Sequence, residues 1–201
     1  MKVLKIIMNK KELASRETRK LIIDKSRELF ISDGFNNVSL NQIAESLGMT
    51  RGALYHHYKN KEDIFINVLE EVQKEVAEYI EQKALEEDDP WDQLVYGCIA
   101  FVRKATEEEV VKILLIDGPS VIPWSKWKEM DNNNSTKTLI EQLDILRRNN
   151  LLDNLNINHS AHLISGALNE LAIYIASGNT ISNEEMESCI TNLLRGFKCN
   201  G

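Results

Sequence analysis

The stretch SLNQIAESLGMTRGALYHHYKNK, residues 39–61, decides the fold of the first part of the chain. Apolar side chains recur at helical spacing on both sides of Gly48, and glycine adopts a positive φ at a sharp turn without strain. Ser39 and Thr50 stand where the two helices would begin, and each hydroxyl can accept an otherwise unpaired backbone N–H. The pattern therefore predicts two short helices joined by a tight turn, which is a helix-turn-helix.

The second helix of this motif exposes side chains suited to DNA. Arg51 lies in its first turn, from which side chains reach base edges in the major groove, and a guanidinium can donate two hydrogen bonds to guanine. Lys61 follows the helix, near the expected line of phosphates. The alternative is a solvated helical hairpin with a chance glycine. Between Arg51 and Lys61 lies a patch of aromatic and hydrogen-bonding side chains, Tyr55, His56, His57 and Tyr58.

A longer segment, DGFNNVSLNQIAESLGMTRGALYHHYKNKEDIF from Asp33 to Phe65, resembles the DNA-binding signature of the TetR (tetracycline-repressor-like) family of bacterial transcription regulators. Beyond this N-terminal part, the resemblance extends only to an all-helical domain of suitable length. The resemblance implies that the positions of Asn41, Arg51 and Gly52 face bases, and that those of Tyr55, His57 and Lys61 touch phosphates or the groove wall. The DNA-binding residues expected on both grounds are Ser39, Asn41, Thr50, Arg51, Gly52, Tyr55, His56, His57 and Lys61.

The net charge is divided unevenly along the chain. The 201 residues carry a formal charge of −7 at pH 7, but residues 1–61 hold 12 Lys and Arg against 6 Asp and Glu, a balance of +6. Residues 62–201 hold 12 basic and 25 acidic side chains, a balance of −13. A basic head attracts phosphate, whereas an acidic body is repelled by it. Accidental segregation of surface charge is the alternative, but the coincidence with the helix-turn-helix supports a DNA-binding head.

Composition favours a cytoplasmic globular protein. Hydrophobic residues make up 43% of the chain and charged residues 27%, and the longest apolar runs are too short to span a bilayer. The N-terminus lacks the pattern of a signal peptide, and Met8 offers an alternative start. Cys98, Cys189 and Cys199 are odd in number and far apart, which fits a reducing compartment without a disulfide framework. We expect Cys98 and Cys189 in the core, with a redox sensor as the alternative.

No strand-type alternation persists, so the chain is expected to be all-α, with about nine to ten helices. We expect an N-terminal helix-turn-helix DNA-binding domain over residues 1–61 and a C-terminal helical ligand-binding and dimerisation domain over residues 62–201. The run Asp117-Gly118-Pro119 should break a helix, and the VIPWSKW that follows should form an irregular loop. Helices are expected over residues 16–32, 40–47, 51–57, 61–85, 91–104, 106–115, 136–149, 159–177 and 183–198.

Two sets of side chains in the helical body are candidates for binding. The first could line a ligand cavity, although aromatic residues in a helical body also serve as core filler: Trp91, Tyr96, Trp124, Trp127, His162 and Asn169. The second lies on the two closing helices, whose excess apolar surface predicts a four-helix dimer interface: Leu163, Ala167, Tyr174, Ile190, Leu194 and Phe197. His159 and His162 share a helix face, but no third ligand is obvious, so neither a metal nor another cofactor is expected.

The chain has no nucleophile elbow, no phosphate-binding glycine loop and no acid pair beside a histidine base, so an enzyme is not expected. We expect a homodimeric DNA-binding transcriptional regulator, a repressor of a palindromic operator that a small apolar or amphipathic ligand releases. Ligand release rests on the resemblance alone. The alternative is a TetR-like architectural or adaptor protein whose body binds another protein. A hollow, partly polar body favours the ligand interpretation, and a filled core favours the adaptor.

Overall fold

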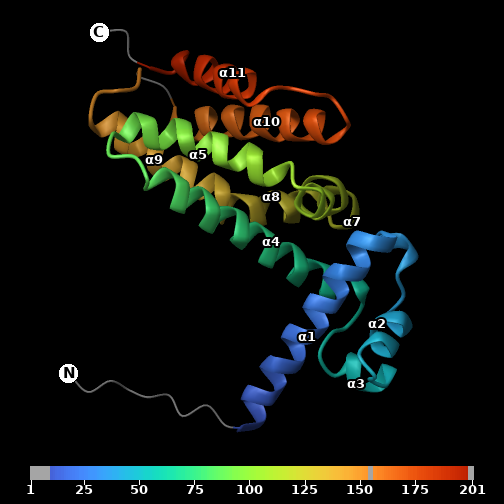
Figure 1. Cartoon of the computed structure of the whole chain (residues 1–201). Helices are drawn as coiled ribbons and strands as arrows, with labels where there is room; N and C mark the ends of the chain where they lie inside the picture. The colour runs from blue at the N-terminus through green and yellow to red at the C-terminus, as the bar shows by residue number, and fades with distance from the viewer. Residues whose placement is uncertain (1–9, 154–155, 199–201) are drawn as a thin grey trace, which may run out of the picture. The chain divides into compact units, whose positions relative to one another are not determined.

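The computed structural model describes residues 10–153 and 156–198, and it confirms the all-α fold (Figure 1). Within these ranges there is no β-strand, and the only β-type pairing is an isolated antiparallel bridge between Leu152 and Lys198. The chain divides into two compact units, residues 1–68 and residues 69–201. None of the helices in the described ranges combines the length and apolar character needed to cross a membrane.

The first unit contains α1 (Lys10–Asp33), the 3-10 turn η1 (Phe35–Asn37), α2 (Leu40–Ser46), α3 (Arg51–Tyr55) and the start of α4 (Lys61–Ala84). Helix α1 begins six residues before the expected start at residue 16, because Lys, Glu, Leu and Ala in its first turns are strong helix formers even without an apolar stripe. Helix α2 packs against both α1 and α3 (Figure 1).

The core of the first unit is an aromatic cluster that joins three elements. The rings of Phe30 in α1, Phe35 in η1 and Phe65 in α4 lie 5.1–5.7 Å apart between centroids, in tilted or edge-on arrangements. Such pairs contribute roughly 0.5–1.5 kcal/mol each beyond their buried area. Ile43 and Leu54 bring α2 and α3 onto the same core, and both are fully buried. The helix-turn-helix is thus held by side chains on its inner faces, which leaves its outer faces free.

The second unit contains the rest of α4 and the following elements in order: α5 (Pro90–Ala105), α6 (Glu108–Val111), the π-helix η2 (Lys112–Asp117), α7 (Gly118–Val121), α8 (Trp124–Asn132), α9 (Ser135–Arg148), α10 (Ile157–Ala176) and α11 (Asn183–Arg195). Helix α5 is central and packs against α9, α10 and α11 (Figure 1). It also lies close to α4, since a Cβ at Gly97 would be 3.5 Å from Ile80 and 3.7 Å from Ala84.

The expected helix break and loop at residues 117–127 are wrong. The chain passes through the π-helix directly into α7, and Pro119 is tolerated there because it sits in the first turn of a helix. Residues from Trp124 onward form α8. The buried Trp127 indole packs against Gly118, where a Cβ would be 2.8 Å from its nitrogen, and donates to the Leu114 carbonyl at 3.0 Å. This tertiary contact orders the segment, and no local pattern signals it.

Candidate nucleic-acid interface and body cavity

Side-chain caps hold both helices of the helix-turn-helix at their N-termini. The Ser39 hydroxyl accepts from the Gln42 N–H at 3.2 Å, and the Gln42 side chain accepts from the Ser39 N–H at 2.8 Å, which completes a capping box. The Thr50 hydroxyl accepts from the Ala53 N–H at 3.2 Å. Gly48 adopts φ 63° in the turn between the helices, as its glycine identity predicts. Ser39 and Thr50 are therefore structural caps that are also exposed.

The N-terminus of α3 presents an exposed guanidinium and a bare backbone. Arg51 donates to the Tyr55 hydroxyl at 3.2 Å, and its guanidinium carbon lies 5.4 Å from the centroid of the Tyr55 ring. This contact orients the arginine along α3 before any partner arrives. Gly52 is exposed and adds no side chain, so a phosphate or base edge can approach the backbone there. Asn41 is exposed on α2.

Two histidines and an arginine meet at the end of α3. His56 is exposed and His57 half-buried. The pKa of His57 is lowered from its ordinary 6.5, first by burial and then by the positive charges of Arg19 and His56. Arg19 donates to the His57 carbonyl at 3.2 Å and stacks 4.5 Å from the centroid of the buried Tyr58 ring. Sequence reasoning missed Arg19, because its partners lie 38 residues away and no local pattern marks it.

Lys61, which the sequence analysis expects near the phosphates of bound DNA, makes its hydrogen bonds within the first unit. Its ammonium donates to the Phe35 carbonyl at 2.6 Å and to the Val38 carbonyl at 2.8 Å, and it lies 4.1 Å from the centroid of the Phe35 ring. Burial lowers its pKa. These contacts tie the start of α4 to the segment between α1 and α2. We therefore assign Lys61 to the support of the motif.

Replacing Lys61 with methionine should lower the free energy of unfolding by about 1–2 kcal/mol, because two carbonyls lose a charged donor. Urea denaturation followed by circular dichroism measures this loss. The matched control is Lys59→Met, since Lys59 is exposed and its change should leave stability unaltered. Full stability of the Lys61 variant together with weaker binding to every duplex would return Lys61 to the phosphate contacts.

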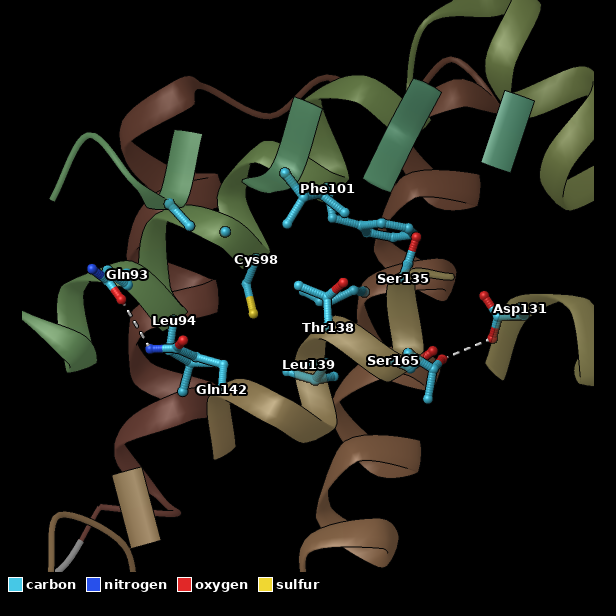
Figure 2. A pocket seen from close by; sticks show the side chains of 15 residues that line it. Gln93, Leu94, Cys98, Phe101, Asp131, Ser135, Thr138, Leu139, Gln142 and Ser165 are labelled. Atoms are coloured by element: carbon cyan, nitrogen blue, oxygen red, sulfur yellow. Dashed lines mark hydrogen bonds between the residues drawn. The ribbon is translucent and has the colours of Figure 1, made fainter. Parts of the chain in front are cut away.

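The second unit contains a cavity of about 70 Å³ that is partly open to solvent (Figure 2). Gln93 and Gln142 lie at one end of it and Asp131 at the other, and Cys98, Thr138 and Leu139 lie between these ends. Burial raises the pKa of the Cys98 thiol in its wall to about 12, so this cysteine stays protonated and is a poor redox sensor. Cys189, expected in the core, is exposed. The lining residues are Ile80, Ala84, Gln93, Leu94, Gly97, Cys98, Phe101, Asp131, Ser135, Thr136, Thr138, Leu139, Gln142, Ser165 and Leu168.

None of the six side chains expected to line a ligand site borders this cavity. Trp91 and Trp127 are buried core residues, which agrees with the alternative that aromatic residues in the body fill the core. Tyr96, Trp124 and His162 are exposed, and Asn169 is half-buried. A usable signal was present in α9, where Ser135, Thr138 and Gln142 recur at helical spacing and face the cavity together. The six expected residues lie on α5, α8 and α10, which do border the cavity, but at positions that face away from it.

The predicted dimer residues divide into two groups. On α10, Leu163 and Tyr174 are exposed and Ala167 is half-buried, and their spacing puts all three on one stripe. Ile190 and Leu194 on α11 are instead buried in the core of their own protomer, so they cannot meet a partner, and their assignment to the interface is wrong. The sequence showed an apolar stripe on α11 but not which structure covers it. Phe197 is half-buried beside a small second cavity.

Comparisons with known proteins agree with this architecture. Residues 22–68 match the family model for bacterial regulatory proteins of the tetR family, and residues 91–197 match that for the tetracyclin repressor-like C-terminal domain. The chain is 33% identical over 102 residues to the HTH-type transcriptional regulator AcrR of Shigella flexneri, a match that covers 50% of this chain and 47% of AcrR. It is 30% identical over 105 residues to the uncharacterized HTH-type transcriptional regulator TtgW of Pseudomonas putida, covering 52% of this chain and 77% of TtgW. The matched stretch spans about half the length of the first curated relatives, 47% of AcrR and 48% of SrpR.

Solved structures share the fold over nearly the whole chain. A TetR-family transcriptional regulator from Pectobacterium atrosepticum superposes with a TM-score of 0.71 at 25% identity, covering 94% of this chain and 97% of that one. The fatty acid degradation regulator FadR from Bacillus halodurans superposes with a TM-score of 0.73 at 17% identity, covering 88% and 94%. At 17% identity, the similarity to FadR shows only that the two chains share a fold.

Proposed function

The chain belongs to the TetR family of bacterial transcription regulators, and from this premise we propose that it is a homodimeric repressor of a palindromic operator. As a member, it is a DNA-binding regulator and not an enzyme. The observation that carries the proposal is the exposed N-terminus of α3, where Arg51 is already oriented by Tyr55. Each protomer offers one such helix, so two protomers related by a two-fold axis would read two inverted half-sites.

Within the operator complex, we assign the exposed side chains of α2 and α3 to two tasks. Asn41, Arg51 and the backbone at Gly52 contact bases. The exposed caps and the end of α3 contact phosphates and sugars, namely Ser39, Thr50, Tyr55, His56 and His57. Residues 1–61 thus serve DNA binding in our proposal, and residues 62–201 serve ligand binding and dimerisation. The charge balance of +6 in the first range and −13 in the second supports this division.

A small molecule in the cavity of the second unit releases the operator in our proposal. Ile80 and Ala84 of α4 line the cavity, while the same helix contributes the buried Ile64 and Phe65 to the first unit. A ligand that displaces α4 therefore acts on the helix that supports the DNA-binding motif. Such coupling typically amounts to about 1–3 kcal/mol. The partly polar cavity supports a ligand over the alternative, an adaptor with a filled body.

Selection from a pool of random duplexes should return two inverted copies of one half-site, because the dimer presents the same helix twice. The affinity should then fall steeply with salt, with a slope of log K against log salt of about −0.9 for each neutralised phosphate. Fluorescence anisotropy on the selected and on scrambled duplexes measures both. Equal affinity for scrambled duplexes, or a flat salt response, would contradict the proposal.

A further inference from the structure

The two ends of the cavity in the second unit differ in chemistry. At one end, the amides of Gln93 and Gln142 lie close together, and Gln142 donates to the Pro90 carbonyl at 2.7 Å and to the Gln93 side chain at 3.4 Å (Figure 2). At the other end lies Asp131, which is only 6% exposed (Figure 2). Every other side chain that borders the cavity is uncharged. The cavity wall therefore carries one ionisable carboxylate and no cation.

The carboxylate of Asp131 is only partly satisfied by its neighbours. Its Oδ2 accepts from the Thr136 hydroxyl at 3.0 Å and pairs with the Lys128 ammonium at 3.1 Å. Within residues 10–153 and 156–198, Oδ1 accepts no hydrogen bond. Oδ1 is not among the buried side-chain atoms that lack a partner, so it is accessible, and a charged carboxylate gains more from a donor than a neutral acceptor does. The end of the cavity at Asp131 thus offers one accessible carboxylate oxygen that can accept a hydrogen bond from a donor.

The size of the cavity limits what can supply this donor. Its volume of about 70 Å³ exceeds what one water molecule needs, which is about 10–15 Å³. It is smaller than the roughly 150 Å³ of an apolar cavity that holds benzene. Leu94, Leu139 and Leu168 supply apolar surface to its wall. The cavity is partly open to solvent, so a slim hydrocarbon can place its polar head inside and extend its chain toward the opening.

We propose that the cavity selects a slim apolar molecule with a hydrogen-bond-donating head, an alcohol or a protonated amine, which binds Asp131, and that it rejects carboxylates and other anions. This inference rests on the proposed function, since it names the ligand class of the same cavity. A donor head can donate to the accessible Oδ1 of Asp131, whereas a carboxylate head supplies no proton and brings a second negative charge beside that carboxylate. Lys128 pairs with Oδ2 and does not border the cavity, so it offers no hydrogen-bond donor to a carboxylate head inside it.

Titration calorimetry of the full chain, without DNA, tests the preference with hexylamine, hexanol and hexanoate, which share one hydrocarbon chain length and differ in the head group. Hexylamine and hexanol should bind at least about tenfold more tightly than hexanoate, the ratio expected from one charge-assisted hydrogen bond. Equal or tighter binding of hexanoate would overturn the inference. So would the failure of all three to bind.

Asp131→Asn should reduce the ratio of hexylamine to hexanoate affinity toward unity and change the affinity for hexanol little, because only the charge is removed. The matched control is Asp144→Asn on α9, which removes a carboxylate that does not border the cavity and should preserve the ratio. An unchanged ratio in the Asp131 variant would overturn the assignment of Asp131. If that variant does not fold, the wild-type ratio alone decides.

Operator release is measured separately, by anisotropy of the labelled operator in the presence of hexanol. Tight binding of hexanol that leaves the operator bound would contradict ligand release while the ligand class stands. Release by hexanoate and not by hexylamine would support ligand release and overturn the ligand class. The two failures are thus distinguishable.

Discussion

Leu194→Glu should abolish folding of the second unit, whereas the same change at Leu163 should leave the protomer folded and separate the dimer. Leu194 is 0% exposed in α11, so a glutamate there would bury a charge without a partner. Such substitutions cost more than about 4 kcal/mol, which is comparable with the total stability of roughly 5–15 kcal/mol of most domains. Thermal unfolding followed by circular dichroism measures the loss.

Leu163 offers the complementary test of the proposed interface, because it is 67% exposed on the α10 stripe that carries Ala167 and Tyr174. A glutamate at this position costs the protomer little but places a charge in an apolar contact between copies. Sedimentation at micromolar protein should then show monomers. The matched control is Leu85→Glu, since Leu85 is 68% exposed and lies outside α10 and α11. A Leu163 variant that dimerises as tightly as the wild type would exclude this stripe as the interface.

Arg51→Ala should remove discrimination at one base pair in each half-site, with a loss of about 1–3 kcal/mol for the preferred base and little change for the others. The reason is that the guanidinium is exposed at the N-terminus of α3 and already oriented by the Tyr55 hydroxyl. Anisotropy titrations with a set of single-base operator variants measure the effect.

Arg51→Lys is the control for charge. Lysine keeps the positive charge but cannot form the planar two-donor contact, so discrimination should fall nearly as far as in the alanine variant. If Arg51 contacts a phosphate instead, the protein with Arg51→Lys should keep most of its affinity. The protein with Arg51→Ala should then bind all operator sequences more weakly and to the same extent. That outcome would move base recognition to Asn41 and to the backbone at Gly52.

The helix-turn-helix could be predicted closely from sequence because its determinants are local. Ser39 and Thr50 cap the helices that follow them, Gly48 takes the positive φ of the turn, and Ile43 and Leu54 face inward as their spacing requires. Each of these effects acts within about one helical turn, so neighbouring residues are sufficient to specify it. The role of Lys61 was harder to predict, since its two carbonyl partners lie 23 and 26 residues away.

The sequence by itself determined the all-α class, the recognition helix with Arg51 at its start and the basic character of the DNA-binding head. Only the tertiary structure decided the rest: that Trp127 orders residues 117–127 against Gly118, that Leu194 faces its own core, and that Asp131 and Gln142 border one cavity. Periodicity identifies which face of a helix is apolar, but burial depends on which helix packs on that face. A cavity, likewise, exists only between elements, so its lining comes from residues as distant as Ile80 and Leu168.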